Sequence, residues 1–255
     1  MALSLVFAVL LSALLHAGWN AAVKAAARPA ETMTAQMLLG AAMVLPALFW
    51  SGLPAMASWP WILASTLSNT VTVAALLRAY ALGGFGVVYP VVRAMSVLLV
   101  VPLAAFLAGD RLGLGALAGI FLIVASLGLL GYSAGRDASF RVGAMVWTGI
   151  AGLSTAVYVL CDAQGVRASG SAMAYGFVVS IGNAAGMSWR LRNTGSPLLI
   201  MRRNWRLGAP AAALRDTSAV FAILIAAIWL RERFTVPRLI AVALATIAVP
   251  LLRLA

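Results

Sequence analysis

An internal repeat is the feature that most constrains how this chain can fold. At an offset of 122 residues, the segment 93–130 aligns with the segment 215–252 without a gap. The polar matches are Arg93 with Arg215, Ser96 with Ser218, and the pair Asp110 and Arg111 with the pair Glu232 and Arg233. Matches between apolar residues carry little weight, since Leu and Ala are frequent throughout the chain. A repeat of about a hundred residues in an apolar chain is typical of a duplicated membrane protein.

The composition places this repeat in a lipid bilayer. The chain is 64% hydrophobic and 9% charged, with a mean hydropathy of +1.02. A water-soluble domain of that composition would expose apolar surface on all sides. The net charge of +12 comes mostly from arginines near helix ends and in short loops, and no basic stripe with interleaved aromatic residues indicates nucleic-acid binding. We therefore expect a multi-pass protein of the cell membrane, such as a bacterial inner membrane.

Apolar stretches bounded by Gly, Pro and charged residues predict an all-α integral membrane protein with about nine transmembrane helices. They lie at about 3–24, 33–51, 60–81, 84–108, 112–132, 143–166, 171–189, 211–230 and 235–252. The first five form one repeat, residues 1–133, and the last four form a second, residues 141–255. Because a repeat of five spans returns the chain on the opposite face, we expect the second repeat to be inverted relative to the first.

The second repeat is one helix short. Asn20 precedes Arg93 by 73 residues, whereas Asp162, at the comparable place in the second repeat, precedes Arg215 by only 53. A helix that spans the bilayer needs roughly 20 residues. The segment 190–208 carries five arginines around an apolar patch that is too short to cross. The expected count is therefore nine, and ten only if a half-helix bends into this segment.

Lysine and arginine residues predict the orientation of the chain. They gather in the loop with Lys24 and Arg28, in the linker with Arg136 and Arg141, and in the segment 190–206. Cytoplasmic loops of membrane proteins carry an excess of these residues. We therefore expect these three connections on the cytoplasmic face.

Several local patterns together resemble one family across essentially the whole chain. They are HAGWN at 16–20 followed by Lys24, AYALGGFGVVYPVVR at 79–93, AGDRL at 108–112, and ALRDTS at 213–218 followed by RERF at 231–234. This layout resembles the EamA-like branch of the drug/metabolite transporter superfamily. The resemblance implies ten helices in two inverted halves around a central cavity, through which small metabolites are exported or imported. The chain departs from that pattern in lacking most or all of the eighth helix, which in the family helps to line the cavity.

Charged residues inside apolar helices are costly, so they tend to face a cavity or a partner. Arg93 and Arg215 are expected either to hold an anionic substrate group or to extend to the nearer membrane interface. Asp162 is the candidate for a proton-coupling carboxylate, with a helix-end charge at the interface as the alternative. Asp216 points about 100° away from Arg215. It is expected to pair with another helix, for instance through Arg78.

Polar and aromatic residues complete the predicted substrate-binding set. His16, Trp19 and Asn20 share one helix face, which favours either substrate contact or a polar contact between helices. Tyrosines near the expected cavity suit organic substrates, although aromatic residues at helix ends also serve as interfacial anchors. The full set is His16, Trp19, Asn20, Tyr80, Tyr89, Arg93, Ser96, Tyr158, Asp162, Arg215, Asp216 and Ser218.

The pattern as a whole predicts a secondary transporter that moves small metabolites by alternating access. Export is one of the two directions of transport that this prediction includes. The alternative is a transport-inactive homologue with a structural or partner-binding role in the membrane. We expect no enzyme and no cofactor, because the chain has one His, one Cys, no paired carboxylates and no metal-ligand spacing. The expected partners are a small-molecule substrate and the lipid bilayer, and we expect no nucleic acid. The sequence does not decide between a monomer and a homodimer.

Overall fold

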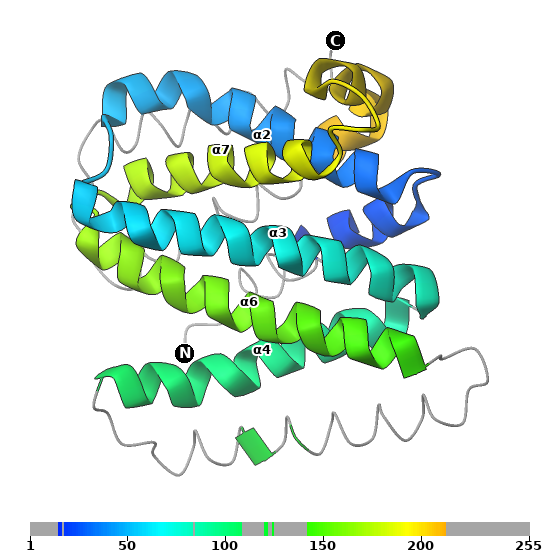
Figure 1. Ribbon diagram of the computed structural model, residues 1–255, viewed down its shortest axis with the longest axis horizontal. Coiled ribbons are helices and arrows are strands. Elements are labelled where there is room, and N and C mark those ends of the chain that lie inside the picture. The colour runs from blue at the N-terminus through cyan, green and yellow to red at the C-terminus, as the bar shows by residue number, and fades with distance from the viewer. Residues whose placement is uncertain are drawn as a thin grey trace, which may run out of the picture. The chain divides into compact units, whose positions relative to one another are not determined.

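The computed structural model describes residues 15–16, 18–83, 85–108, 120–121, 124 and 142–212, which are helical apart from short connections (Figure 1). The helices are α2 (Pro29–Ser51), η1 (Met56–Ser58), α3 (Trp59–Leu82), α4 (Phe85–Ala108), α6 (Val142–Ala168) and α7 (Ala172–Arg190). Further helical residues occupy 15–16, 18–25 and 197–212. Because no strand occurs in these ranges, the all-α prediction is confirmed for the described part of the chain.

Three of the described helices are long and apolar enough to cross a membrane. They are Pro29–Ser51, Met56–Leu82 and Val142–Ala168. Large apolar side chains project from the helices: Phe49 on α2 is 89% exposed and Phe106 on α4 is 82% exposed. Water-soluble proteins rarely display such apolar faces, whereas lipid is a suitable environment for them. The helices predicted at 211–230 and 235–252 lie almost wholly outside the described residues, as does most of the one at 112–132.

Most described helix boundaries fall within a few residues of their predicted positions. Among α2, α3, α4, α6 and α7, the largest difference is at α2, which begins at Pro29 rather than near residue 33. Proline is favoured at the first helical position, because its missing N–H would have no partner there, and the acidic Glu31 suits the positive end of the helix. The helix ends at Gly52, whose φ of 69° requires a glycine and whose N–H donates to the Leu48 carbonyl at 3.0 Å.

The segment that precedes residue 211 contains a helix. We expected an apolar patch too short to cross, with a half-helix as the alternative, and a new helix from about residue 211, whereas one helix occupies 197–212. It starts after Ser196, whose hydroxyl accepts the N–H of Leu199 at 3.3 Å. Ile200, Gly208 and Ala211 form a buried face while the arginines are exposed, so the charges do not interrupt the helix.

Contacts group the chain into two compact units. The central unit is Leu53–Gly186, and the terminal unit combines Met1–Gly52 with Met187–Ala255. Each unit contains residues from both predicted repeats. The domain prediction of 1–133 and 141–255 is based on sequence similarity and stays a prediction.

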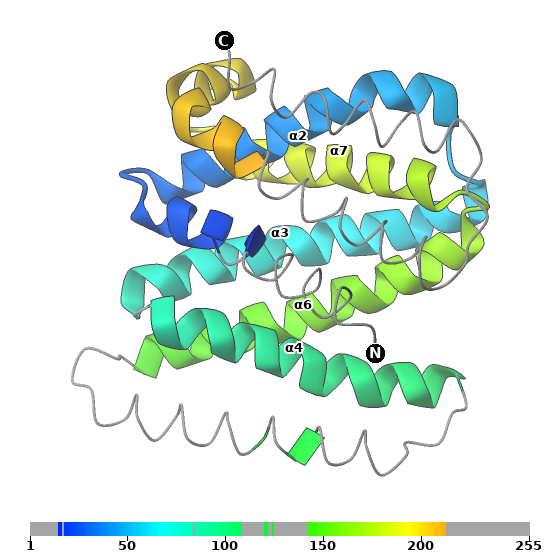
Figure 2. The same ribbon diagram turned by 180° about the vertical axis from the view of Figure 1, so that it is seen from behind.

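In the central unit, α6 runs alongside both α3 and α4 (Figures 1 and 2). α3 and α6 are antiparallel along their whole length. Leu82 at the end of α3 contacts Gly143 at the start of α6, and near the other end the Ala55 N–H donates to the Ser169 carbonyl at 3.0 Å. This long pairing brings polar residues near the end of α6 next to those of the first half of α3.

Candidate functional site

A carboxylate lies among hydroxyl groups where α3, α6 and α7 meet in the central unit. The Tyr175 hydroxyl of α7 donates to Oδ1 of Asp162 of α6 at 3.0 Å. The Ser65 hydroxyl of α3 lies beside both groups without a hydrogen bond to either in the described part of the chain. Tyr175 and Ser65 are buried, and Asp162 is partly buried. Because a carboxylate inside apolar helices is costly without hydrogen-bond donors, this arrangement is the strongest candidate for a functional site.

Close packing of α7 against α6 fixes the position of the Tyr175 ring. The ring lies so close to Gly165 that a Cβ atom at residue 165 would overlap it. Tyr175 also packs with Ile62 and Val179 in a buried cluster. The Ser171 hydroxyl begins α7 by accepting the N–H of Ala174 at 3.3 Å. These contacts hold the tyrosine hydroxyl toward Asp162.

Further polar residues follow Ser65 along the same side of α3. Ser65, Asn69 and Thr72 are spaced by four and three residues, which places them on one helix face. The Thr72 hydroxyl donates to Ser154 Oγ of α6 at 2.8 Å. Because α3 and α6 are antiparallel, Asn69 lies at the level of Tyr158, between this contact and Asp162. The three helices therefore share a polar layer, which is unusual in apolar helices.

Two amide oxygens in the central unit are buried without a donor. Within the described part of the chain, neither Oδ1 of Asn69 on α3 nor Oδ1 of Asn183 on α7 accepts a hydrogen bond. α3 and α7 pack closely here, since a Cβ at Gly182 would lie 2.6 Å from the Thr66 hydroxyl. Buried acceptors normally have a partner, so each marks a place where a water molecule or a polar ligand group would supply a donor.

The predicted residues of the central unit fall into different surroundings. Asp162 is at the centre of the polar cluster, and Tyr158 lies one helical turn before it. Tyr80 and Tyr89 are brought together through Phe85, with ring centroids 5.4 Å and 5.1 Å from it. These rings pack with an apolar core around Leu76, Ala79, Val88 and Val92. The tyrosine rings therefore contribute to packing between α3, α4 and α6.

The predicted residues on α4 do not form a buried charged site. Arg93 is exposed, whereas Ser96 is buried and its hydroxyl donates to the Arg93 carbonyl at 2.8 Å. Arg78, suggested above as a partner for Asp216, lies over the Trp147 ring at 4.6 Å, a cation–π contact. Arg215, Asp216 and Ser218 lie outside the described residues.

His16, Trp19 and Asn20 come together in the terminal unit, as their spacing predicts. The His16 and Trp19 rings meet edge to face with centroids 5.2 Å apart. The Asn20 side-chain amide donates to the His16 carbonyl at 2.9 Å, and both Trp19 and Asn20 are buried. The shared face is confirmed. These residues belong to the terminal unit, and Asp162 belongs to the central unit.

Sequence reasoning missed Tyr175 and Ser65. A usable signal was the short connection 169–171, which makes α6 and α7 antiparallel neighbours. A tyrosine in the first turn of α7 can then reach a carboxylate about two turns before the end of α6. Ser65 carried no comparable signal, since it is one of several small polar residues in α3.

Comparison with known proteins found no matching family model and no matching curated protein. The resemblance to EamA-like transporters therefore rests on the motifs alone. Within the described ranges, no group of three or more His, Cys, Asp and Glu side chains is arranged to hold a metal ion.

Proposed function

We propose that this protein is a secondary transporter of small metabolites in the cell membrane, built from two inverted EamA-like repeats with nine membrane-spanning helices. The observation that supports it best is the hydrogen bond from Tyr175 to Asp162, beside Ser65, because α3 and α6 belong to segments that are long and apolar enough to cross a membrane. Such intramembrane carboxylates usually mark ion or substrate pathways. Asp162 is the group that binds a proton or a cationic substrate group in this proposal.

Asp162 can couple protonation to movement of the helices. As a carboxylate it accepts the Tyr175 hydrogen bond and ties α6 to α7. Once protonated, it loses its charge and one oxygen becomes a donor, so the requirement for the tyrosine hydroxyl is removed. A change in the α6–α7 contact would then accompany each proton bound or released, as alternating access requires.

The neighbouring amides indicate the chemistry of the substrate. Asn69 and Asn183 offer buried acceptor oxygens that lack donors among the described residues. A substrate with N–H or O–H groups would satisfy them when the helices separate. The proposed substrate class is therefore a small polar or amphipathic metabolite that carries hydrogen-bond donors.

Transport by the reconstituted full chain tests the proposal. Proteoliposomes with an imposed pH gradient would be assayed for flux of amino acids, nucleosides and amphipathic cations. We expect pH-driven accumulation by the wild type, its loss in Asp162→Asn, and a reduction of about tenfold in Tyr175→Phe, the effect of one hydrogen bond to a charged group. Thr148→Val is the matched control, because the Thr148 hydroxyl donates to the Ala144 carbonyl of its own helix at 2.6 Å.

The same assay separates the transporter from the alternative function. Absence of flux for every compound, in protein that elutes as a folded species, would contradict transport and favour a structural or partner-binding role. Loss of flux in Thr148→Val to the same extent as in Asp162→Asn would show that the polar cluster has no special part in it.

A further inference from the structure

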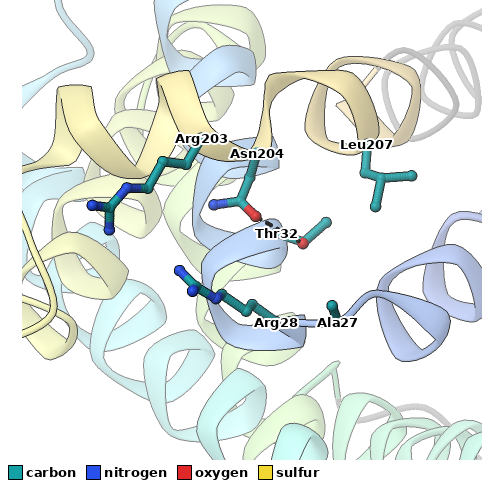
Figure 3. Close-up of a pocket in the computed structure, with 6 residues that line it drawn as sticks. All are labelled: Ala27, Arg28, Thr32, Arg203, Asn204 and Leu207. Carbon is teal, nitrogen blue, oxygen red and sulfur yellow. Dashed lines mark hydrogen bonds between the residues drawn. The ribbon is translucent and has the colours of Figure 1, made fainter.

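A pocket of about 510 Å³ lies in the terminal unit and takes no part in the proposed transport site (Figure 3). It is formed where the start of α2 meets the helix over 197–212. Its lining residues are Ala27, Arg28, Thr32, Arg203, Asn204 and Leu207. The volume is within the range of pockets that hold small ligands.

Two arginines give this pocket its chemical character. Figure 3 shows the side chains of Arg28 and Arg203 extending to the same side of the pocket, Arg28 from the residue that precedes α2 and Arg203 from the helix over 197–212. Two guanidinium groups that face a shared space repel each other unless an anion lies between them. Both side chains are reachable from solvent, since the side chain of Arg28 is 59% exposed and Arg203 is also exposed.

The nearest acidic residue does not neutralise both arginines. Glu31 is 7% exposed and does not line the pocket. One carboxylate oxygen accepts from Arg28 Nη1 at 3.4 Å and the other accepts from Asn204 Nδ2 at 3.0 Å. Arg203 makes no ion pair with any residue that the structure describes. At least one positive charge therefore remains for a ligand.

The two arginines select the kind of anion. The Asn204 side-chain nitrogen already donates to Glu31 and to the Ile200 carbonyl, each at 3.0 Å. The Thr32 hydroxyl is buried and lies 3.5 Å from Asn204 Oδ1, so it belongs to the pocket wall. The guanidinium groups match the several oxygens of a phosphate group, which arginine binds by paired hydrogen bonds.

We propose that this pocket binds a phosphate group, held by Arg28 and Arg203, with the carbon part of a phosphate ester against Leu207. The source is either the headgroup of an anionic lipid or a soluble phosphate compound. The pocket also brings together two of the basic segments that the charge pattern predicts on the cytoplasmic face, where anionic lipid headgroups attract such segments.

Binding to the purified full chain in a neutral detergent tests this site. Radiolabelled inorganic phosphate would be measured by equilibrium dialysis, and phosphatidylglycerol by native mass spectrometry with diacylglycerol as the lipid that lacks phosphate. We expect retention of phosphatidylglycerol, of inorganic phosphate, or of both, and no retention of diacylglycerol. Binding of the lipid alone would identify a headgroup site, and binding of inorganic phosphate would identify a site for soluble phosphate compounds.

Neighbouring arginines provide the matched variants. Arg203→Gln should weaken binding by about tenfold, since it removes a charge-assisted contact. Arg202→Gln removes the same charge from the adjacent position, which does not line the pocket, and should change binding by less than about twofold. As a second variant, Leu207→Glu places a carboxylate at the pocket wall and should abolish binding while both arginines remain.

Two results would overturn the proposal. The first is that neither phosphate nor phosphatidylglycerol binds to the folded wild type. The second is that Arg202→Gln and Arg203→Gln weaken binding equally, because a diffuse positive surface would then explain the effect without the pocket. Melting temperatures of all variants in the same detergent would establish that each compared protein is folded.

Discussion

Gly165 determines whether the tyrosine hydroxyl can reach the carboxylate of the candidate site. The Tyr175 ring occupies the space that any side chain at residue 165 would need. The hydrogen bond to Asp162 at 3.0 Å therefore depends on a residue that carries no polar group itself. Glycine at a helix contact commonly allows this kind of close approach in membranes.

Gly165→Val should displace the Tyr175 ring and lower the stability of the protein. Overpacking of this kind costs about 1–3 kcal/mol, and the interhelical hydrogen bond is lost as well. The measurement is the melting temperature in detergent, compared with Gly149→Ala in the same helix, where a Cβ would meet nothing within 4 Å. The control should be neutral or slightly stabilising, because Ala favours a helix more than Gly does. Equal melting temperatures for both variants would disprove the packing argument.

Asn204 holds a buried carboxylate in the terminal unit. Its amide nitrogen lies 3.0 Å from Glu31 Oε2, and Arg28 contacts the other oxygen. Asn204→Ala should therefore destabilise the protein by about 1–3 kcal/mol, since a buried charged group loses a donor. Unfolding in denaturant measures the change. In a Glu31→Gln background, Asn204→Ala should reduce the stability by less, because no charged group is left without a donor. An equal reduction in both backgrounds would contradict the explanation by an unpaired charge.

At the scale of helices, polar contacts align elements that are otherwise apolar. The contact between Thr72 and Ser154, at 2.8 Å, joins α3 and α6 midway along their antiparallel pairing. Lipid offers no hydrophobic driving force between helices, so close packing and such contacts decide which faces meet.

A double-mutant cycle on Thr72→Val and Ser154→Ala should show a favourable coupling of about 0.6 kcal/mol, the average for hydrogen bonds between membrane helices. Denaturation of the wild type, both single variants and the double variant in mixed micelles provides the four free energies. A coupling of zero would mean that each hydroxyl is satisfied within its own helix, since Ser154 also donates to the Ile150 carbonyl at 2.6 Å.

The predicted helix ranges agree with the structure where an apolar run had clear ends, and the prediction left alternatives open where arginines interrupt the run. α3 and α6 are close to their predicted ranges, because proline, glycine and charged residues flank continuous apolar runs. The helix over 197–212 was expected only as the half-helix alternative, since Arg202, Arg203 and Arg206 dominate its composition. A helix needs only one apolar face to pack, and the arginines occupy the other faces.

At the scale of the whole molecule, the number of spans decides the topology. Nine helices place residue 1 and residue 255 on opposite faces of the membrane, whereas ten place them on the same face. We expect opposite faces. Paired reporters, one active only in the cytoplasm and one only outside it, fused before Met1 and after Ala255, would measure this directly. A result with both reporters on the same side would show that the second repeat holds a further span.

The sequence by itself determined that this chain forms apolar helices, and it predicted Asp162 as the candidate for a proton-coupling carboxylate. Both conclusions depend on the composition of a local stretch, because a bilayer selects long apolar runs and penalises each charge within them. Only the tertiary structure decided that Tyr175 meets Asp162 and that Arg28 and Arg203 share a pocket. Such contacts join residues on different helices, and they depend on which helix faces pack together, a property that no local pattern contains.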